Sequence, residues 1–200
     1  MFETNFVIVT GFLGTGKTTF IIELAKRLTE EKDKKINILV NDFGQIAIDG
    51  ETLNDFGMEA KRITKGCVCC EVKQDLVAQI RDLKKNFEPD IIILETSGVA
   101  SLLPIYRTVE QYVDEIETLT LIDVSRYDKL MEKFRTVENQ LTFADRILIN
   151  KIDLADDEEM KKIEEKVSKF LNKENPDGQL HKISARKKIG LENVVSGIVQ

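Results

Sequence analysis

The stretch that decides the fold is residues 6–18, F-V-I-V-T-G-F-L-G-T-G-K-T, near the start of a 200-residue chain. It opens with a short, continuous apolar run rich in β-branched side chains, which is typical of a strand buried on both faces. A glycine-rich turn follows. Beyond it, apolar residues recur at helical spacing, at Ile21, Leu24, Ala25 and Leu28. The stretch therefore predicts a strand, a tight turn and a helix.

The turn from Gly11 to Thr18 fits the phosphate-loop pattern G-x-x-x-x-G-K-[ST]. Glycine lets successive backbone N–H groups face one anion, and the following helix adds its positive end. Lys17 is expected to reach the β- and γ-phosphates and act in catalysis, and the Thr18 hydroxyl to ligate Mg²⁺. The alternative is a glycine-rich turn with an exposed lysine, which the flanking strand and helix disfavour. The nucleotide-binding residues expected here are Gly11, Gly14, Thr15, Gly16, Lys17, Thr18 and Thr19.

The rest of the chain alternates short apolar runs with amphipathic segments. This alternation predicts an α/β fold, a P-loop NTPase three-layer sandwich with a largely parallel central sheet and helices on both faces. The length fits a single domain over residues 1–200. Strands are predicted at 36–40, 61–64, 91–94, 119–124, 147–149 and 180–184, and further helices around 76–83, 160–170 and 191–199.

Composition excludes several classes of protein. The chain is 42% hydrophobic and 32% charged, with a formal net charge of -6, so no nucleic-acid partner is expected. No apolar run approaches the roughly 18 residues of a membrane span, and no membrane partner is expected. The N-terminus has no basic region or cleavage site, so a cytoplasmic location is expected.

The segment Asn150-Lys151-Ile152-Asp153 directly follows a predicted strand and fits N-K-x-D, the guanine-reading signature of GTPases. The Asp153 carboxylate can accept hydrogen bonds from both guanine N1–H and the exocyclic amine, and adenine presents no such pair of donors. The alternative is a solvated turn that ends the strand. Ser184 and Ala185 belong to I-S-A, which looks like the second guanine-contacting loop of such GTPases. GTP, with GDP as its product, is therefore the expected nucleotide.

Glu95 stands at the end of the apolar run 91–94 and begins E-T-S-G. Ligands of open α/β sheets bind outside the carboxyl ends of the strands. Glu95 is therefore expected near Mg²⁺, through water, and in the catalytic set, unless it only caps the next turn. Gly98 is expected to let the backbone approach the γ-phosphate.

All three cysteines fall in one pentapeptide, G-C-V-C-C, at Cys67, Cys69 and Cys70. Three thiolates in one irregular loop could hold a soft metal ion and leave a fourth position open. The paired spacing of structural zinc ribbons is absent. A redox switch and packing in the core are the alternatives.

Together these blocks resemble the CobW-like GTPases, relatives of the hydrogenase and urease nickel-insertion GTPases. The resemblance rests on the phosphate loop, V-N-D-F-G-Q-I-A-I-D-G at 40–50, G-C-V-C-C, E-T-S-G, the N-K-x-D block at 138–154 and I-S-A. It implies that the cysteines bind a transition metal, zinc or else cobalt or nickel, and that Asp42 lies near metal and nucleotide.

The sequence departs from the family in three ways. The family usually has glutamate where Asp42 stands, so direct ligation of the metal by Asp42 is in doubt. The usual C-terminal domain is absent from the 200 residues, and the only histidine is His181.

The resemblance also implies a coupling between nucleotide state and metal delivery to a client metalloenzyme or cofactor-enzyme, with a nucleotide-dependent homodimer. Asp42 or Asp49 could orient the hydrolytic water. Two alternatives remain: a regulatory GTPase that gates cofactor loading of a partner enzyme, and a redox sensor that uses the cysteines as a switch.

Overall fold

The computed structural model describes residues 3–40, 59–62 and 71–198, with only the backbone described at 59–62 and 71–74. Its centre is a seven-stranded sheet in the order β3-β2-β4-β1-β5-β6-β7, and every pairing is parallel. The strands are β1 (Asn5–Thr10), β2 (Ile36–Val40), β3 (Glu59–Arg62), β4 (Ile91–Glu95), β5 (Ile116–Asp123), β6 (Arg146–Asn150) and β7 (Gln179–Lys182).

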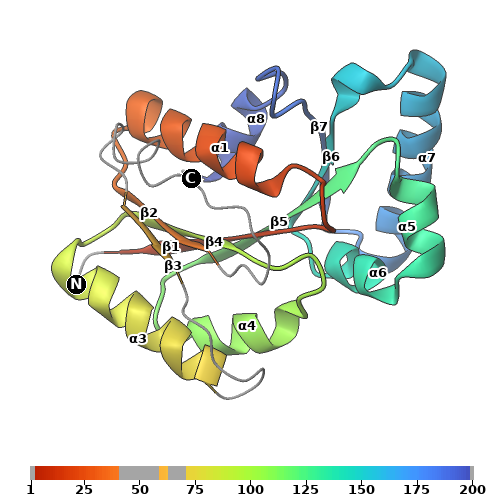
Figure 1. Ribbon diagram of the computed structural model, residues 1–200. Helices are drawn as coiled ribbons and strands as arrows, with labels where there is room; N and C mark the ends of the chain where they lie inside the picture. Colours follow the sequence, from red (N-terminus) through yellow and green to blue (C-terminus); the bar gives the residue numbers. More distant parts are fainter. Residues whose placement is uncertain (1–2, 41–58, 63–70, 199–200) are drawn as a thin grey trace.

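Helices cover both faces of this sheet (Figure 1). One face packs against α1 (Lys17–Lys32) and α8 (Glu192–Ile198). The opposite face packs against five helices, in two separate apolar clusters. One cluster forms with α3 (Glu71–Asn86) and α4 (Leu102–Val109), and the other with α5 (Tyr127–Lys133), α6 (Arg135–Thr142) and α7 (Asp157–Glu174). The short 3-10 helix η1 (Ile152–Leu154) follows β6.

Strand β1 shows why its sequence reads as a continuous apolar run. Val7 and Val9 pack against α1, and Phe6 and Ile8 pack on the opposite face with α3 and α4. Each is at most 1% exposed. Burying such a side chain contributes roughly 1.5–3 kcal/mol. Both faces of the sheet are therefore buried under helices. The predicted three-layer α/β architecture is confirmed.

The boundaries differ from the predictions at several short elements. The strand predicted at 61–64 lies at Glu59–Arg62, and β5 begins three residues before the predicted position 119. Helices α4, α5 and α6 were not predicted. Each has eight residues or fewer, too short to show several helical repeats of apolar side chains. Within the described part of the chain, no helix is both long and apolar enough to cross a membrane.

The parallel sheet places the carboxyl ends of all strands along one edge. The loops after β1, β4, β5 and β6 leave from this edge, and they carry the phosphate loop, E-T-S-G and N-K-x-D. In open α/β sheets this is the edge at which ligands bind. The fold thus brings together motifs that are more than 130 residues apart in the sequence.

Candidate functional site

The phosphate loop needs its glycines for geometric reasons. Gly11 and Gly16 have φ angles of +135° and +94°. A Cβ at Gly11 would collide with the Leu121 carbonyl oxygen, and a Cβ at Gly16 would lie 2.5 Å from Asn150 Nδ2. Helix α1 begins at Lys17, directly after this turn. The helix N-terminus therefore opens onto the loop, as anion binding requires.

Side chains inside the loop pair with its first carbonyl groups. Lys17 is 8% exposed, and its Nζ donates to Gly11 O at 3.0 Å and to Phe12 O at 3.4 Å. The Thr15 hydroxyl donates to Phe12 O at 2.9 Å. Lys17 thus lies along the loop, and its predicted contact with the phosphates stays a prediction. Thr19 is exposed on the first turn of α1.

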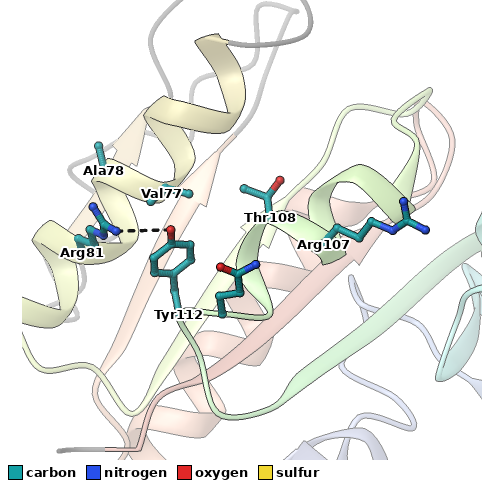
Figure 2. A pocket seen from close by; sticks show the side chains of 7 residues that line it. Val77, Ala78, Arg81, Arg107, Thr108 and Tyr112 are labelled. Carbon is teal, nitrogen blue, oxygen red and sulfur yellow. Dashed lines mark hydrogen bonds between the residues drawn. The ribbon is translucent and has the colours of Figure 1, made fainter.

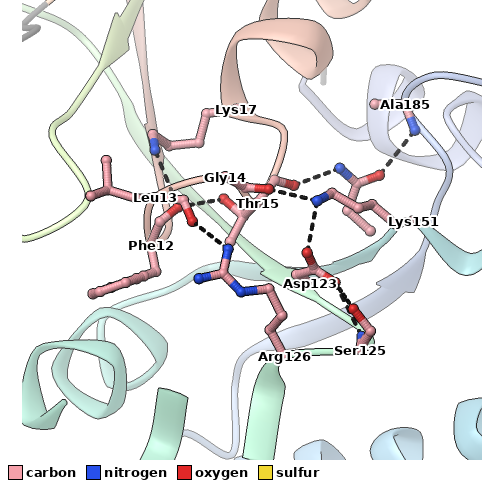
Figure 3. A network of polar contacts seen from close by, with 11 residues as sticks. Phe12, Leu13, Gly14, Thr15, Lys17, Asp123, Ser125, Arg126, Lys151 and Ala185 are labelled. Atoms are coloured by element: carbon pink, nitrogen blue, oxygen red, sulfur yellow. Dashed lines mark hydrogen bonds and ion pairs between the residues drawn. The ribbon is translucent and has the colours of Figure 1, made fainter. Parts of the chain in front are cut away.

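Three side chains from the end of β6 and from the loops after β5 and β6 pair with the next three carbonyl groups. Asn150 Nδ2 donates to Thr15 O at 2.8 Å, and Lys151 Nζ donates to Gly14 O at 2.6 Å. Arg126 Nη1 donates to Leu13 O at 2.9 Å. Figure 3 shows these donors around the loop. The base motif and the phosphate loop are therefore directly hydrogen-bonded to each other.

Thr18 and Glu95 meet at the start of α1. The Thr18 hydroxyl donates to Glu95 Oε1 at 2.8 Å. Glu95 ends β4 and pairs in register with Val9, which lies two residues before the phosphate loop. A hydroxyl and a carboxylate beside a phosphate loop are the hard oxygen ligands that Mg²⁺ takes. The two residues predicted to hold Mg²⁺ are thus brought together and fit that ion.

The E-T-S-G turn lies against the phosphate loop. A Cβ at Gly98 would lie 2.7 Å from the Leu13 backbone nitrogen, so only glycine fits this approach. The turn is held by Gln140, a buried residue of α6, whose Nε2 donates to Gly98 O at 3.4 Å and to Ala100 O at 3.3 Å. The sequence interpretation missed Gln140, which carries no local signal of this contact.

The base motif is held by the loop after β7. Asn150 Oδ1 accepts from the Ala185 backbone N–H at 3.0 Å, and the Ser184 hydroxyl donates to Asp153 Oδ1 at 2.5 Å. Asp153 itself is exposed. Its carboxylate is thus oriented by a neighbour and open to a ligand. N-K-x-D and the I-S-A loop thus form one hydrogen-bonded unit, while the predicted contact of both with guanine stays a prediction.

The sequence interpretation also missed Asp123, the last residue of β5. It is 2% exposed, and its Oδ2 pairs with Lys151 Nζ at 2.7 Å. Its Oδ1 accepts from the backbone N–H and the hydroxyl of Ser125 at 3.1 and 2.9 Å. An acidic residue ending an apolar strand was the available signal, the same one that identified Glu95.

The proposed transition-metal site falls outside the described residues, which exclude Asp42, Asp49, Cys67, Cys69 and Cys70. Among the residues that are described, no group of three or more His, Cys, Asp or Glu side chains could hold a metal ion. His181 lies in β7, where burial lowers its pKa.

A surface groove of about 480 Å³ lies elsewhere, between α3 and α4 (Figure 2). Val77 and Ala78 line its α3 side, and Arg81 Nη2 donates to the Tyr112 hydroxyl at 3.4 Å. Arg107 also lines it, but its guanidinium points away from Arg81. No residue of the nucleotide motifs lines this groove, so it is separate from the phosphate loop.

Comparison with known proteins finds a matching family model and several relatives. A family model described as CobW/HypB/UreG, nucleotide-binding domain, matches residues 5–176. The zinc chaperone YjiA of Escherichia coli (strain K12) is 31% identical over 175 residues, covering 82% of this chain and 53% of that protein. The zinc chaperone YeiR of the same organism is 36% identical over 164 residues, covering 76% and 47%. The chain spans about half the length of these curated relatives.

Solved structures of two GTPase-family proteins superpose on this chain. The hydrogenase maturation factor HypB from Archaeoglobus fulgidus superposes with a TM-score of 0.70 at 25% identity, covering 98% of this chain and 89% of that one. The Zn(II)-bound YjiA GTPase from E. coli superposes with a TM-score of 0.60 at 26% identity, covering 84% and 55%. With its matched family model and its parallel sheet, the chain belongs to the CobW/HypB/UreG family.

Proposed function

We propose that this chain binds and hydrolyses GTP and couples its nucleotide state to the delivery of a transition metal. The observation that carries the nucleotide part is Asn150, which joins Thr15 O of the phosphate loop to Ala185 N of the base loop. One buried side chain thus sets the spacing between the place for the phosphates and the place for the base. Asp153, oriented by Ser184, would accept from both donors of guanine.

Hydrolysis would use the residues around Lys17. The Lys17 ammonium and the loop N–H groups would bind the β- and γ-phosphoryl oxygens and stabilise the charge that develops there. Thr18 and Glu95 would hold Mg²⁺, which supplies further neutralisation of phosphate charge when bound. Gly98 would place its backbone beside the γ-phosphate. We assign the orientation of the hydrolytic water to Asp42 or Asp49.

The cargo proposal rests on sequence and on relatives. Cys67, Cys69 and Cys70 lie within four positions of the sequence and as thiolates would suit a soft metal ion, and two of the relatives are named zinc chaperones. Zinc is therefore the first candidate, with cobalt and nickel next. Asp42 is a possible further ligand. The partner would be a client metalloenzyme or cofactor-enzyme, and a second copy of the chain could bind in a nucleotide-dependent way.

The sheet topology supports a coupling between the two sites. Val40, the last residue of β2, pairs in register with both Arg62 of β3 and Glu95 of β4. Strands β2 and β3 therefore end at the edge that also carries Glu95, directly before residues 41–58 and 63–70 in the sequence. A change in nucleotide state at Glu95 could thus reach both segments. Such coupling is reciprocal, so bound metal should also change nucleotide affinity.

The nucleotide proposal is tested by measuring GTP and ATP affinity in the wild type and in Asp153→Asn. Strong preference for GTP that is lost in Asp153→Asn supports the assignment. Equal affinity for both nucleotides in the wild type would contradict it. Hydrolysis that a partner stimulates without any dependence on metal would instead favour a regulatory GTPase that gates cofactor loading.

A further inference from the structure

The phosphate loop is held from outside by three donors, of which only two belong to the base motif. Leu13, Gly14 and Thr15 follow one another, and each carbonyl accepts from a different side chain (Figure 3). A loop that binds an anion through its N–H groups must turn its carbonyls away from that anion. The third donor, Arg126, lies outside every motif that the sequence offered.

Arg126 is placed next to Asp123, the same buried residue whose carboxylate orients Lys151. Its backbone N–H donates to Asp123 O at 3.1 Å, and the preceding Ser125 is tied to Asp123 Oδ1. Asp123 Oδ2 pairs with Lys151. One aspartate at the end of β5 therefore positions two cations, which reach adjacent carbonyls of the loop.

Gly14 gives a second line of support. The phosphate-loop pattern leaves this position unspecified, yet the residue here is glycine. Its φ angle is +78°, and a Cβ would lie 3.0 Å from Arg126 Nη1. The guanidinium thus lies in tight contact with the position that a Cβ at residue 14 would take, and the positive φ angle independently favours glycine there. The glycine and the arginine fit each other.

Because Arg126 is exposed, its effect on nucleotide binding can be measured apart from any effect on the stability of the fold. Its side chain is exposed, so removing it strands no buried charge and should change the stability of the fold little. Its contact with the loop should instead matter when a nucleotide binds. A loop already fixed in its binding conformation loses less entropy on binding.

We propose that Arg126 is a positioning residue for the nucleotide, which fixes the Leu13 carbonyl outward and keeps the loop's N–H groups facing the phosphates. This inference rests on the proposed GTP-binding function. Because the contact is made to the loop backbone and not to the γ-phosphate, it should serve GTP and GDP alike.

The test measures Kd for GTP and GDP, together with kcat and KM for GTP, in Arg126→Met, which keeps the stem and removes the donors. Arg126→Lys is the conservative variant. Arg135→Met is the matched control, because Arg135 is an exposed arginine of α6 with no contact to the phosphate loop in the described part of the chain.

Arg126→Met should raise Kd for both nucleotides by about 3–10-fold, within the net range for an ordinary hydrogen bond because the guanidinium is exposed, with kcat within about twofold of wild type. Arg126→Lys should recover part of the affinity, and Arg135→Met should match the wild type. Unchanged Kd values in Arg126→Met would overturn this inference but leave the proposed GTP-binding function standing. A loss confined to kcat would also overturn it. A wild type that bound neither nucleotide would remove the proposed function and this inference with it.

Discussion

Replacing Asn150 with alanine tests the link between phosphate loop and base loop most sharply. Asn150 is 2% exposed and makes two hydrogen bonds to backbone groups, at 2.8 Å to Thr15 O and at 3.0 Å from Ala185 N. Alanine would leave one buried acceptor and one buried donor without this partner. Each such group costs about 1–3 kcal/mol, so the total for the two is on the order of 2–6 kcal/mol.

That cost should divide between folding and binding. Without nucleotide, both loops can shift and admit water, which relieves part of it. With nucleotide bound, the loops must return to their spacing. We expect GTP affinity to fall by about 10–100-fold, which corresponds to about 1.4–2.8 kcal/mol, and the free energy of unfolding without nucleotide to fall by about 1–2 kcal/mol.

The assay is calorimetric titration with GTP, paired with urea unfolding of nucleotide-free protein. Asn150→Asp separates the two bonds, because a carboxylate still accepts from Ala185 N but turns an oxygen toward Thr15 O. It should bind GTP at least as weakly as Asn150→Ala. Asn193→Ala is the control, since Asn193 is exposed on α8. Wild-type GTP affinity in Asn150→Ala would refute the reasoning.

Three further predictions follow from the same structure. Asp153→Asn should lower GTP affinity by roughly 100-fold or more, because an amide cannot accept from both guanine donors. It should gain affinity for xanthosine triphosphate, whose exocyclic C2 carbonyl oxygen can accept from the new amide; competition between the two nucleotides measures this. Thr18→Ala removes the hydroxyl that lies 2.8 Å from Glu95 Oε1, and so should raise the Mg²⁺ concentration needed for half-maximal hydrolysis, as a Mg²⁺ titration at fixed GTP would show. Burial raises the pKa of Glu117 to about 7, against the opposing effect of Arg146. A raised pKa means that the folded state binds more protons than the unfolded state between about pH 4.5 and 7. The free energy of unfolding that Glu117 contributes should therefore fall as pH rises through that window, by on the order of 1–3 kcal/mol. Urea unfolding at pH 5 and pH 8 should show a smaller decline in Glu117→Gln than in wild type, and an equal decline in both would contradict the assignment.

The strand, loop and helix at the start of the chain could be predicted because local signals agree there. An apolar run, three glycines and a helical period all indicate the same arrangement between Phe6 and Leu28. The short helices α4 to α6 lack enough repeats to be seen in the sequence.

In the site, too, some residues could be predicted from the sequence and others could not. Motif residues such as Lys17 and Asn150 could be identified because the chemistry of phosphate and guanine constrains type and spacing. Asp123, Arg126 and Gln140 act through contacts with segments 28 to 113 residues away. The parallel sheet collects strand ends at one edge and so brings Asp123 and Arg126 to the phosphate loop, and the packing of α6 brings Gln140 to the E-T-S-G turn.

The central claim is that nucleotide state and a cysteine-bound metal are coupled. The measurement that tests it most directly is titration of zinc, cobalt and nickel into reduced protein, with and without a non-hydrolysable GTP analogue, in wild type and in Cys67→Ser. The account predicts stoichiometric binding that depends on Cys67 and whose affinity changes with the analogue. Binding that ignored the nucleotide, or no binding at all, would contradict it.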